Sequence, residues 1–96
     1  MRVVWSPTAR RQVLAAVERI SDDWPNVAAA WFDGLIERTS LLTDLPTQGR
    51  VVPEWSDDSV REILYEPYRV VYEVHADRVE ILVLSHFRQK FPNKMG

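Results

Sequence analysis

The sequence predicts an α+β fold in which a helical hairpin packs on one face of a small antiparallel sheet, in the order β-α-α-β-β-β. Two observations support this prediction. Apolar residues recur at helical spacing through the first half of the chain, and they alternate with polar residues through much of the second half. With 96 residues, the chain is long enough for one core, so we expect a single domain over residues 1–96.

The first half of the chain predicts a short strand followed by two helices. Residues Arg2–Trp5 are β-rich, and Ser6-Pro7 is a helix-opening pair because serine caps and proline suits the first turn. Asn26 is the expected cap of the second helix, which ends at Leu45-Pro46. A loop this short makes the helices antiparallel. The residues expected to face the sheet are Val13, Val17, Phe32, Leu35 and Leu42.

The second half predicts three strands, Val60–Tyr65, Tyr68–His75 and Arg78–Ser85. Glu66-Pro67 and Ala76-Asp77 separate them, and connections this short require antiparallel pairing. A two-residue turn at Ala76-Asp77 would pair His75 with Arg78, Val74 with Val79, Tyr72 with Ile81 and Val70 with Val83.

This register gives the sheet two different faces. An apolar face is expected to receive the helices and carries Val70, Tyr72, Val74, Val79, Ile81 and Val83. The other face mixes charged and apolar side chains, which is typical of a protein-binding surface if no element covers it. Its expected members include Glu62, Leu64, Arg69, Val71, Glu73, Glu80, Leu82 and Leu84.

Composition excludes several functional classes. The chain has no cysteine, which excludes disulfides and thiolate metal sites, and we expect neither a metal nor a cofactor. No apolar run is long enough for a signal sequence or a membrane span, so we expect a cytoplasmic protein. The net charge of −2 and the pI of about 5.6 argue against unaided nucleic-acid binding.

The motifs of the second half resemble those of the RelE/ParE toxin superfamily of type II toxin–antitoxin systems. The resemblance rests on their order, which is Pro46-x-x-Gly49-Arg50-Val51-Val52-Pro53-Glu54, Arg61-Glu62-Ile63, Tyr68-Arg69-Val70-Val71-Tyr72-Glu73-Val74 and finally Val79 to His86. It implies a toxin that a cognate antitoxin silences in a hetero-oligomeric complex, with the antitoxin's C-terminal segment wrapped around the toxin.

The superfamily has two branches with different targets. RelE-like members cut messenger RNA in the ribosome, whereas ParE-like members poison DNA gyrase. The nuclease branch typically places lysines on the strand before Tyr-Arg, to stabilise charge on the cleaved phosphodiester. Here that strand offers Val60 and Glu62, and Glu62 is a diagonal neighbour that could neutralise Arg69. We therefore favour the ParE-like branch, with plasmid stabilisation as an implied role and no catalytic residue.

Two alternatives stay open. YoeB-like nucleases use a glutamate base, an arginine and a terminal histidine acid, and the corresponding residues here are Glu54, Arg69 and His86. An ion pair would equally explain Arg69, and a solvated strand end would explain His86. The second alternative is an inactive relic that only binds the antitoxin.

The resemblance and the predicted faces together suggest the binding residues. The antitoxin is expected to contact the open sheet face at Glu62, Leu64, Arg69, Val71, Leu82 and Leu84. The target is expected to contact a loop tryptophan and the basic tail, namely Trp55, Phe87, Arg88 and Lys90. His75, at a hairpin corner, is interpreted as structural.

Overall fold

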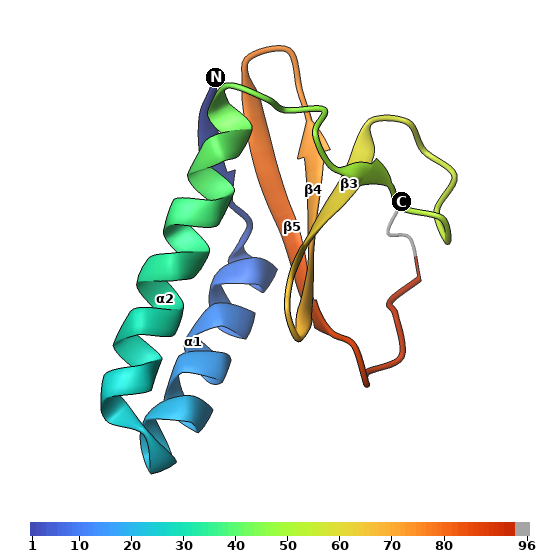
Figure 1. Cartoon of the computed structure of the whole chain (residues 1–96). Coiled ribbons are helices and arrows are strands. Elements are labelled where there is room, and N and C mark those ends of the chain that lie inside the picture. Colours follow the sequence, from blue (N-terminus) through green and yellow to red (C-terminus); the bar gives the residue numbers. More distant parts are fainter. Residues whose placement is uncertain (94–96) are drawn as a thin grey trace.

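The computed structural model describes residues 1–93 and has two layers, a helical hairpin and a sheet (Figure 1). The α+β class and the predicted order β-α-α-β-β-β are confirmed, with a 3-10 turn and a two-residue edge strand in addition. The elements are β1 (Arg2–Trp5), α1 (Pro7–Asp23), α2 (Pro25–Ser40), η1 (Leu41–Thr43), β2 (Arg50–Val51), β3 (Val60–Tyr65), β4 (Tyr68–Val74) and β5 (Arg78–His86).

The start of α1 confirms the predicted cap. The Ser6 hydroxyl accepts a hydrogen bond from the backbone N–H of Ala9 at 3.0 Å, and Pro7 takes the first helical position. The start of α2 differs from the prediction, because the helix begins at Pro25 and Asn26 lies inside it. Proline at this position has no N–H to satisfy, so the helix starts without a side-chain cap.

The sheet is mixed, with strand order β1-β5-β4-β3-β2. Strands β3, β4 and β5 pair antiparallel, as predicted, and β2 also pairs antiparallel with β3. Strand β1 runs parallel to β5, with Val3 opposite Val79. The two helices and three strands between β1 and β5 provide the long connection that a parallel pair requires. Both predicted two-residue turns, Glu66-Pro67 and Ala76-Asp77, are present.

A β-bulge corrects the predicted register of the β4–β5 pair. Tyr72 lies opposite Ile81 as expected, but Val71 lies opposite Val83, so Leu82 is an extra residue on β5. Val70 therefore pairs with Leu84 and not with Val83. Because a shift of one residue exchanges the faces of a strand, Leu84 joins the core under the helices and Val83 packs on the opposite face.

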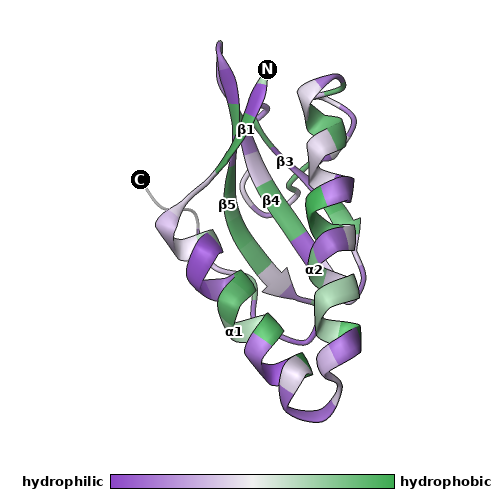
Figure 2. Cartoon of the chain, turned by 90° about the vertical axis from the view of Figure 1, so that its left-hand side faces the viewer, coloured by the Kyte–Doolittle hydropathy of each residue, from purple (hydrophilic) through white to green (hydrophobic). Residues whose placement is uncertain are grey.

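The main core lies between the helices and the sheet, where the apolar stretches of β4 and β5 run beneath α1 and α2 (Figure 2). Val13, Leu35 and Leu42 are buried there and Val17 packs against them, as predicted. Phe32 is a correction, since it is exposed on the outer side of α2. The remaining buried members are Ala9, Ala16, Ile63, Tyr68, Val70, Tyr72, Val79, Ile81 and Leu84.

A second, smaller core covers the sheet face that was predicted to be open. Val52, Val60 and Val71 are buried in it, and Trp55, Leu82, Val83 and Phe91 pack against them. The covering segments are the loop between β2 and β3 and the C-terminal tail, which lie on the side of the sheet away from the helices (Figure 1). The C-terminal tail therefore contributes to a core through Phe91. Within residues 1–93, no helix has the length and apolar character needed to cross a membrane.

Candidate functional site

Arg69 of β4 is the centre of a charged cluster on the sheet face opposite the helices. Its Nε donates to Oε1 of Glu62 at 2.5 Å, and its two terminal nitrogens donate to the two carboxylate oxygens of Glu54, each at 2.8 Å. The other oxygen of Glu62 accepts from Nε of Arg50 at 2.5 Å. The Arg69 guanidinium also lies 3.8 Å from the centre of the Phe91 ring. The predicted neutralisation of Arg69 by Glu62 is thus confirmed.

Glu54 has the electrostatics of an ion-pair partner and not those of a base. Its bidentate hydrogen bonds with Arg69 lower its pKa from about 4.5 to about 2, and the same contacts raise the pKa of Arg69. A general base works best when its pKa lies near the working pH. At neutral pH, Glu54 would be a weak proton acceptor held by the arginine that a nuclease needs for its phosphate.

The lowered pKa of Glu54 predicts a specific acid sensitivity. A carboxylate whose pKa is lower in the folded state contributes stability above its unfolded pKa, near 4.5, and loses it as the pH falls toward 2. The Glu54 side chain is 44% exposed, so the contribution should stay below about 1 kcal/mol. Thermal unfolding at pH 6.5 and pH 3 should therefore show a smaller acid-induced loss in Glu54→Gln than in the parent.

The matched control for this measurement is Glu66→Gln, because Glu66 is exposed and makes no ion pair within residues 1–93. This variant should lose stability with acid as the parent does. An equal response of Glu54→Gln and the parent would show that the Arg69 contact contributes nothing.

His86 is separated from the other two nuclease candidates by the sheet itself. It lies directly opposite Tyr68 across the β4–β5 pair, and the edge of one ring contacts the face of the other with 5.2 Å between centres. Tyr68 belongs to the core under the helices, and Arg69, the next residue, projects to the opposite face. His86 Nδ1 accepts a hydrogen bond from the Arg88 N–H at 3.0 Å. The structure brings Glu54 and Arg69 together but not His86.

The residues predicted to contact a target divide into two groups. Trp55 is partly buried, because its ring packs on Phe91 and its Nε1 donates to the carbonyl of Pro92 at 2.9 Å. Trp55 thus joins the loop to the tail, and only part of its side chain is available to a target. Phe87, Arg88 and Lys90 are exposed in the turn that follows β5, where a partner could reach them.

Residues 3–91 match the family model for the ParE toxin of the type II toxin–antitoxin system parDE. The chain belongs to the ParE toxin family. Among solved structures, it is similar to the chromosomal ParDE toxin–antitoxin system from P. aeruginosa, with a TM-score of 0.75 and 20% sequence identity over 90% of this chain and 95% of that chain. At this identity, the likeness supports the fold. The chain has no match among curated protein sequences.

The sheet face predicted to bind the antitoxin is only partly accessible in this ParE chain. Val71 is buried beneath the chain's own loop and tail, and Leu84 is buried under the helices because of the bulge. Glu62 is buried as well, and its carboxylate is paired with Arg50 and Arg69. Leu82 and Arg69 are partly buried, and Leu64 is exposed. An antitoxin could reach Leu64, Arg69 and Leu82 directly, but the other three predicted residues are not available to it.

An accessible apolar surface lies on the helical hairpin, which the sequence reasoning did not identify as a binding surface. A groove of about 300 Å³ there is lined by Trp5, Arg10, Val13, Leu14, Phe32 and Ile36. Leu14 is 62% exposed, and Phe32 and Ile36 are also exposed. One signal was present in the sequence: Leu35 and Ile36 are adjacent, and two neighbouring helical residues cannot both face the same core. We refer to this surface as the hairpin groove.

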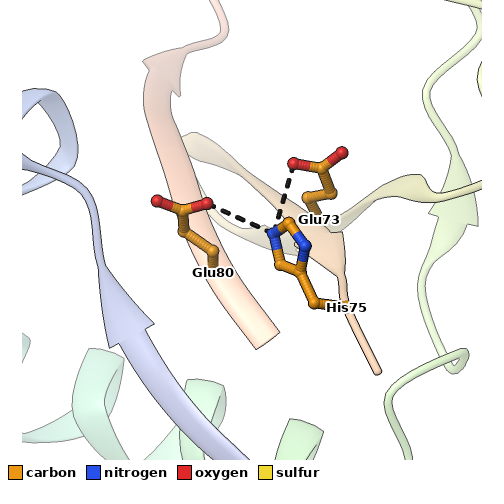
Figure 3. Close-up of side chains that lie close together, drawn as sticks. All are labelled: Glu73, His75 and Glu80. Atoms are coloured by element: carbon orange, nitrogen blue, oxygen red, sulfur yellow. Dashed lines mark hydrogen bonds and ion pairs between the residues drawn. The ribbon is translucent and has the colours of Figure 1, made fainter. Parts of the chain in front are cut away.

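A second group of polar side chains gathers at the β4–β5 hairpin of the ParE fold, where Glu73, His75 and Glu80 point toward one another (Figure 3). The His75 Nε2 lies 3.3 Å from a carboxylate oxygen of Glu73 and 3.3 Å from one of Glu80. The sequence reasoning treated His75 as structural and did not combine it with the two glutamates. The strand register was the available signal, because it places Glu73 directly opposite Glu80.

Proposed function

We propose that this ParE-family chain is a toxin that inhibits growth by binding and poisoning DNA gyrase, and that a cognate antitoxin neutralises it. The observation that carries this proposal is the separation of the nuclease candidates. Glu54 is ion-paired with Arg69, and His86 lies on the other face of the sheet. Proton transfer in RNA cleavage would need the base and the acid on the same side, within reach of one phosphodiester.

A protein-binding role suits the remaining accessible surface. An exposed aromatic and basic turn at the end of the sheet is formed by Phe87, Arg88 and Lys90. Such a turn can bind a partner without any catalytic arrangement of side chains. Exposed charges of this kind govern the rate and orientation of association with a partner of opposite charge. We propose this turn as the contact with gyrase, which would place the activity in the cytoplasm.

Induction of the chain without its antitoxin tests the assignment. We expect growth inhibition accompanied by loss of gyrase supercoiling in vitro, with no new messenger RNA ends in ribosome-associated transcripts. Messenger cleavage with intact supercoiling would replace the proposal by the nuclease alternative. If supercoiling, messenger RNA and growth were all unaffected while antitoxin binding persisted, the relic alternative would hold.

We further propose that the antitoxin docks in the hairpin groove, where apolar side chains are accessible without displacement of the chain's own loop or tail. Apolar side chains exposed side by side, at Leu14, Phe32 and Ile36, are typical of a surface that a partner covers. The same groove holds Arg10, which would suit a carboxylate on the partner. An amphipathic segment of the antitoxin, apolar on one side and acidic at its edge, fits this chemistry.

Leu14→Asp is expected to weaken antitoxin binding by at least about tenfold, because it places an unpaired charge in a desolvated apolar contact. The free toxin should keep its stability, since the Leu14 side chain is 62% exposed. Calorimetric titration of the antitoxin, with thermal unfolding of the free chain, measures both quantities.

Val27→Asp is the matched control, because Val27 is also exposed on the hairpin but does not line the groove. It should leave antitoxin affinity unchanged. Equal affinities for Leu14→Asp and the parent would move the antitoxin contact away from the groove, and Leu64→Asp would then test the accessible part of the sheet face.

A further inference from the structure

Two carboxylates face each other at the β4–β5 hairpin, and within residues 1–93 the only basic side chain in contact with them is that of His75. Glu73 on β4 lies directly opposite Glu80 on β5 in the antiparallel register. Like charges in this position destabilise a sheet. Within residues 1–93, neither carboxylate makes an ion pair with arginine or lysine, and the only group between them is the ring of His75 (Figure 3). A cation bound between the two carboxylates would therefore stabilise the hairpin.

The single nitrogen Nε2 of His75 does not satisfy both carboxylates. Each of the two contacts from His75 Nε2 is 3.3 Å long, whereas a hydrogen bond to a carboxylate from a charged donor is about 2.7–2.9 Å. Nε2 carries at most one proton, which can point at only one carboxylate at a time. The Nε2 atom therefore faces two carboxylate oxygens at once, which is the arrangement of donor atoms around a metal ion.

We propose that Glu73, His75 and Glu80 bind a divalent transition-metal ion of the Zn²⁺ class. Zinc takes imidazole nitrogen and carboxylate oxygen at about 2.0–2.2 Å in a tetrahedron, so neighbouring ligand atoms lie about 3.3–3.5 Å apart. Both distances from Nε2 equal 3.3 Å, and all three ligand atoms lie within 4.8 Å of one another. Because the three side chains are partly exposed, water can take the fourth position.

The hairpin holds the three ligands in place before a metal arrives. The backbone N–H of His75 donates to the carbonyl of Arg78 at 2.8 Å, which closes the turn. The pairing of Glu73 with Glu80 fixes the other two ligands on adjacent strands. A bound ion would cross-link β4 to β5 and remove the repulsion between the carboxylates. The nitrogen ligand favours Zn²⁺ or Ni²⁺ over Mg²⁺ and Ca²⁺, which prefer oxygen ligands.

Calorimetric titration of the full chain with Zn²⁺ tests the site, using protein without a histidine tag. We expect one ion per chain and a melting temperature several degrees higher at saturating Zn²⁺, with no comparable effect of Mg²⁺. His75→Gln should lower the affinity for Zn²⁺ by at least about tenfold. His86→Gln is the matched control, because the chain has only 2 histidines and His86 lies at the other end of β5.

Glu80→Gln separates metal binding from folding. It removes one of two opposed charges, so the metal-free variant should be as stable as the parent or more so. Its stabilisation by Zn²⁺ should nevertheless disappear. Zn²⁺ should also shift the imidazole NMR signals of His75 and leave those of His86 in place. The proposal is overturned if Zn²⁺ does not bind at a 1:1 ratio, or if His75→Gln and Glu80→Gln bind it as tightly as the parent does.

Discussion

Glu62→Ala is expected to lower the free energy of unfolding by about 1–3 kcal/mol, the usual cost of leaving a buried polar group without its partner. The Glu62 side chain is 1% exposed, and its two oxygens accept hydrogen bonds from Arg50 and Arg69. Its removal leaves the Arg69 guanidinium, which is only 15% exposed, with one carboxylate fewer in a partly desolvated position. Urea unfolding monitored by tryptophan fluorescence measures the loss.

Arg50→Ala is the control for the Glu62 variant, since it removes a partner of the same carboxylate from the solvent side. The Arg50 side chain is 64% exposed, so its loss should cost less than about 1 kcal/mol. The double variant Glu62→Ala with Arg69→Ala should cost less than the sum of the two single variants, because the contact between these two side chains is lost only once. A cost for Glu62→Ala similar to that of Arg50→Ala would show that water solvates the cluster.

Local signals in the sequence predicted the helical layer and the turns. Ser6-Pro7 marked the start of α1, because a serine hydroxyl caps a backbone N–H only a few residues away and proline suits the first helical turn. The two short breaks between strands likewise determined the antiparallel meander. The helix start and the turns depend on contacts between residues that are close in the sequence, so the sequence alone predicts them.

The bulge at Leu82 depends on distant contacts and was not predictable in this way. The Ser6 hydroxyl donates to the Leu82 carbonyl at 2.9 Å, and the Leu84 N–H donates to the Gln12 side chain at 2.7 Å. These contacts join β5 to the start of α1, more than 70 residues away in sequence. The bulge moved Leu84 to the helix side, so the predicted antitoxin face lost one of its members.

The candidate site shows the same division. The pairing of Glu62 with Arg69 was predictable because the two residues lie on adjacent strands joined by a tight turn. Glu54 contacts Arg69 from a loop, and the Phe91 ring of the tail packs on the Arg69 guanidinium. Neither contact is indicated by a hydrophobic periodicity or by a sequence motif. For this reason, Glu54 could be assigned as a possible base from the sequence but recognised as an ion-pair partner only from the structure.

The separation of Glu54 from His86 leads to the prediction that decides the mechanism. Glu54→Ala and His86→Ala should both retain growth inhibition, because a gyrase poison needs no proton transfer. In a nuclease, loss of the base or the acid would cost about 10²-fold or more in cleavage. Colony formation after induction, with messenger mapping and gyrase supercoiling measured on the same variants, distinguishes the two cases.

Substitutions in the exposed turn after β5 should, in contrast, abolish growth inhibition. Arg88→Glu combined with Lys90→Glu should abolish growth inhibition and gyrase binding, since reversed charges repel the surface that the parent attracts. Both side chains are exposed, so folding should be unaffected. Charge reversal is a cleaner test than deletion from Phe87 onward, because deletion removes Phe91 from the second core and includes residues 94–96, which lie outside the described part of the chain.

Arg11→Glu is the control for charge reversal, since Arg11 is exposed on α1 and does not belong to the turn, and it should leave toxicity unchanged. Toxicity that survives the reversal of Arg88 and Lys90 would remove the turn as the gyrase contact. Toxicity that disappears in His86→Ala, together with ribosome-dependent messenger cleavage by the parent, would contradict gyrase poisoning. In that case Glu54 would have to leave Arg69 during catalysis, and the ion pair would be a resting state of a nuclease.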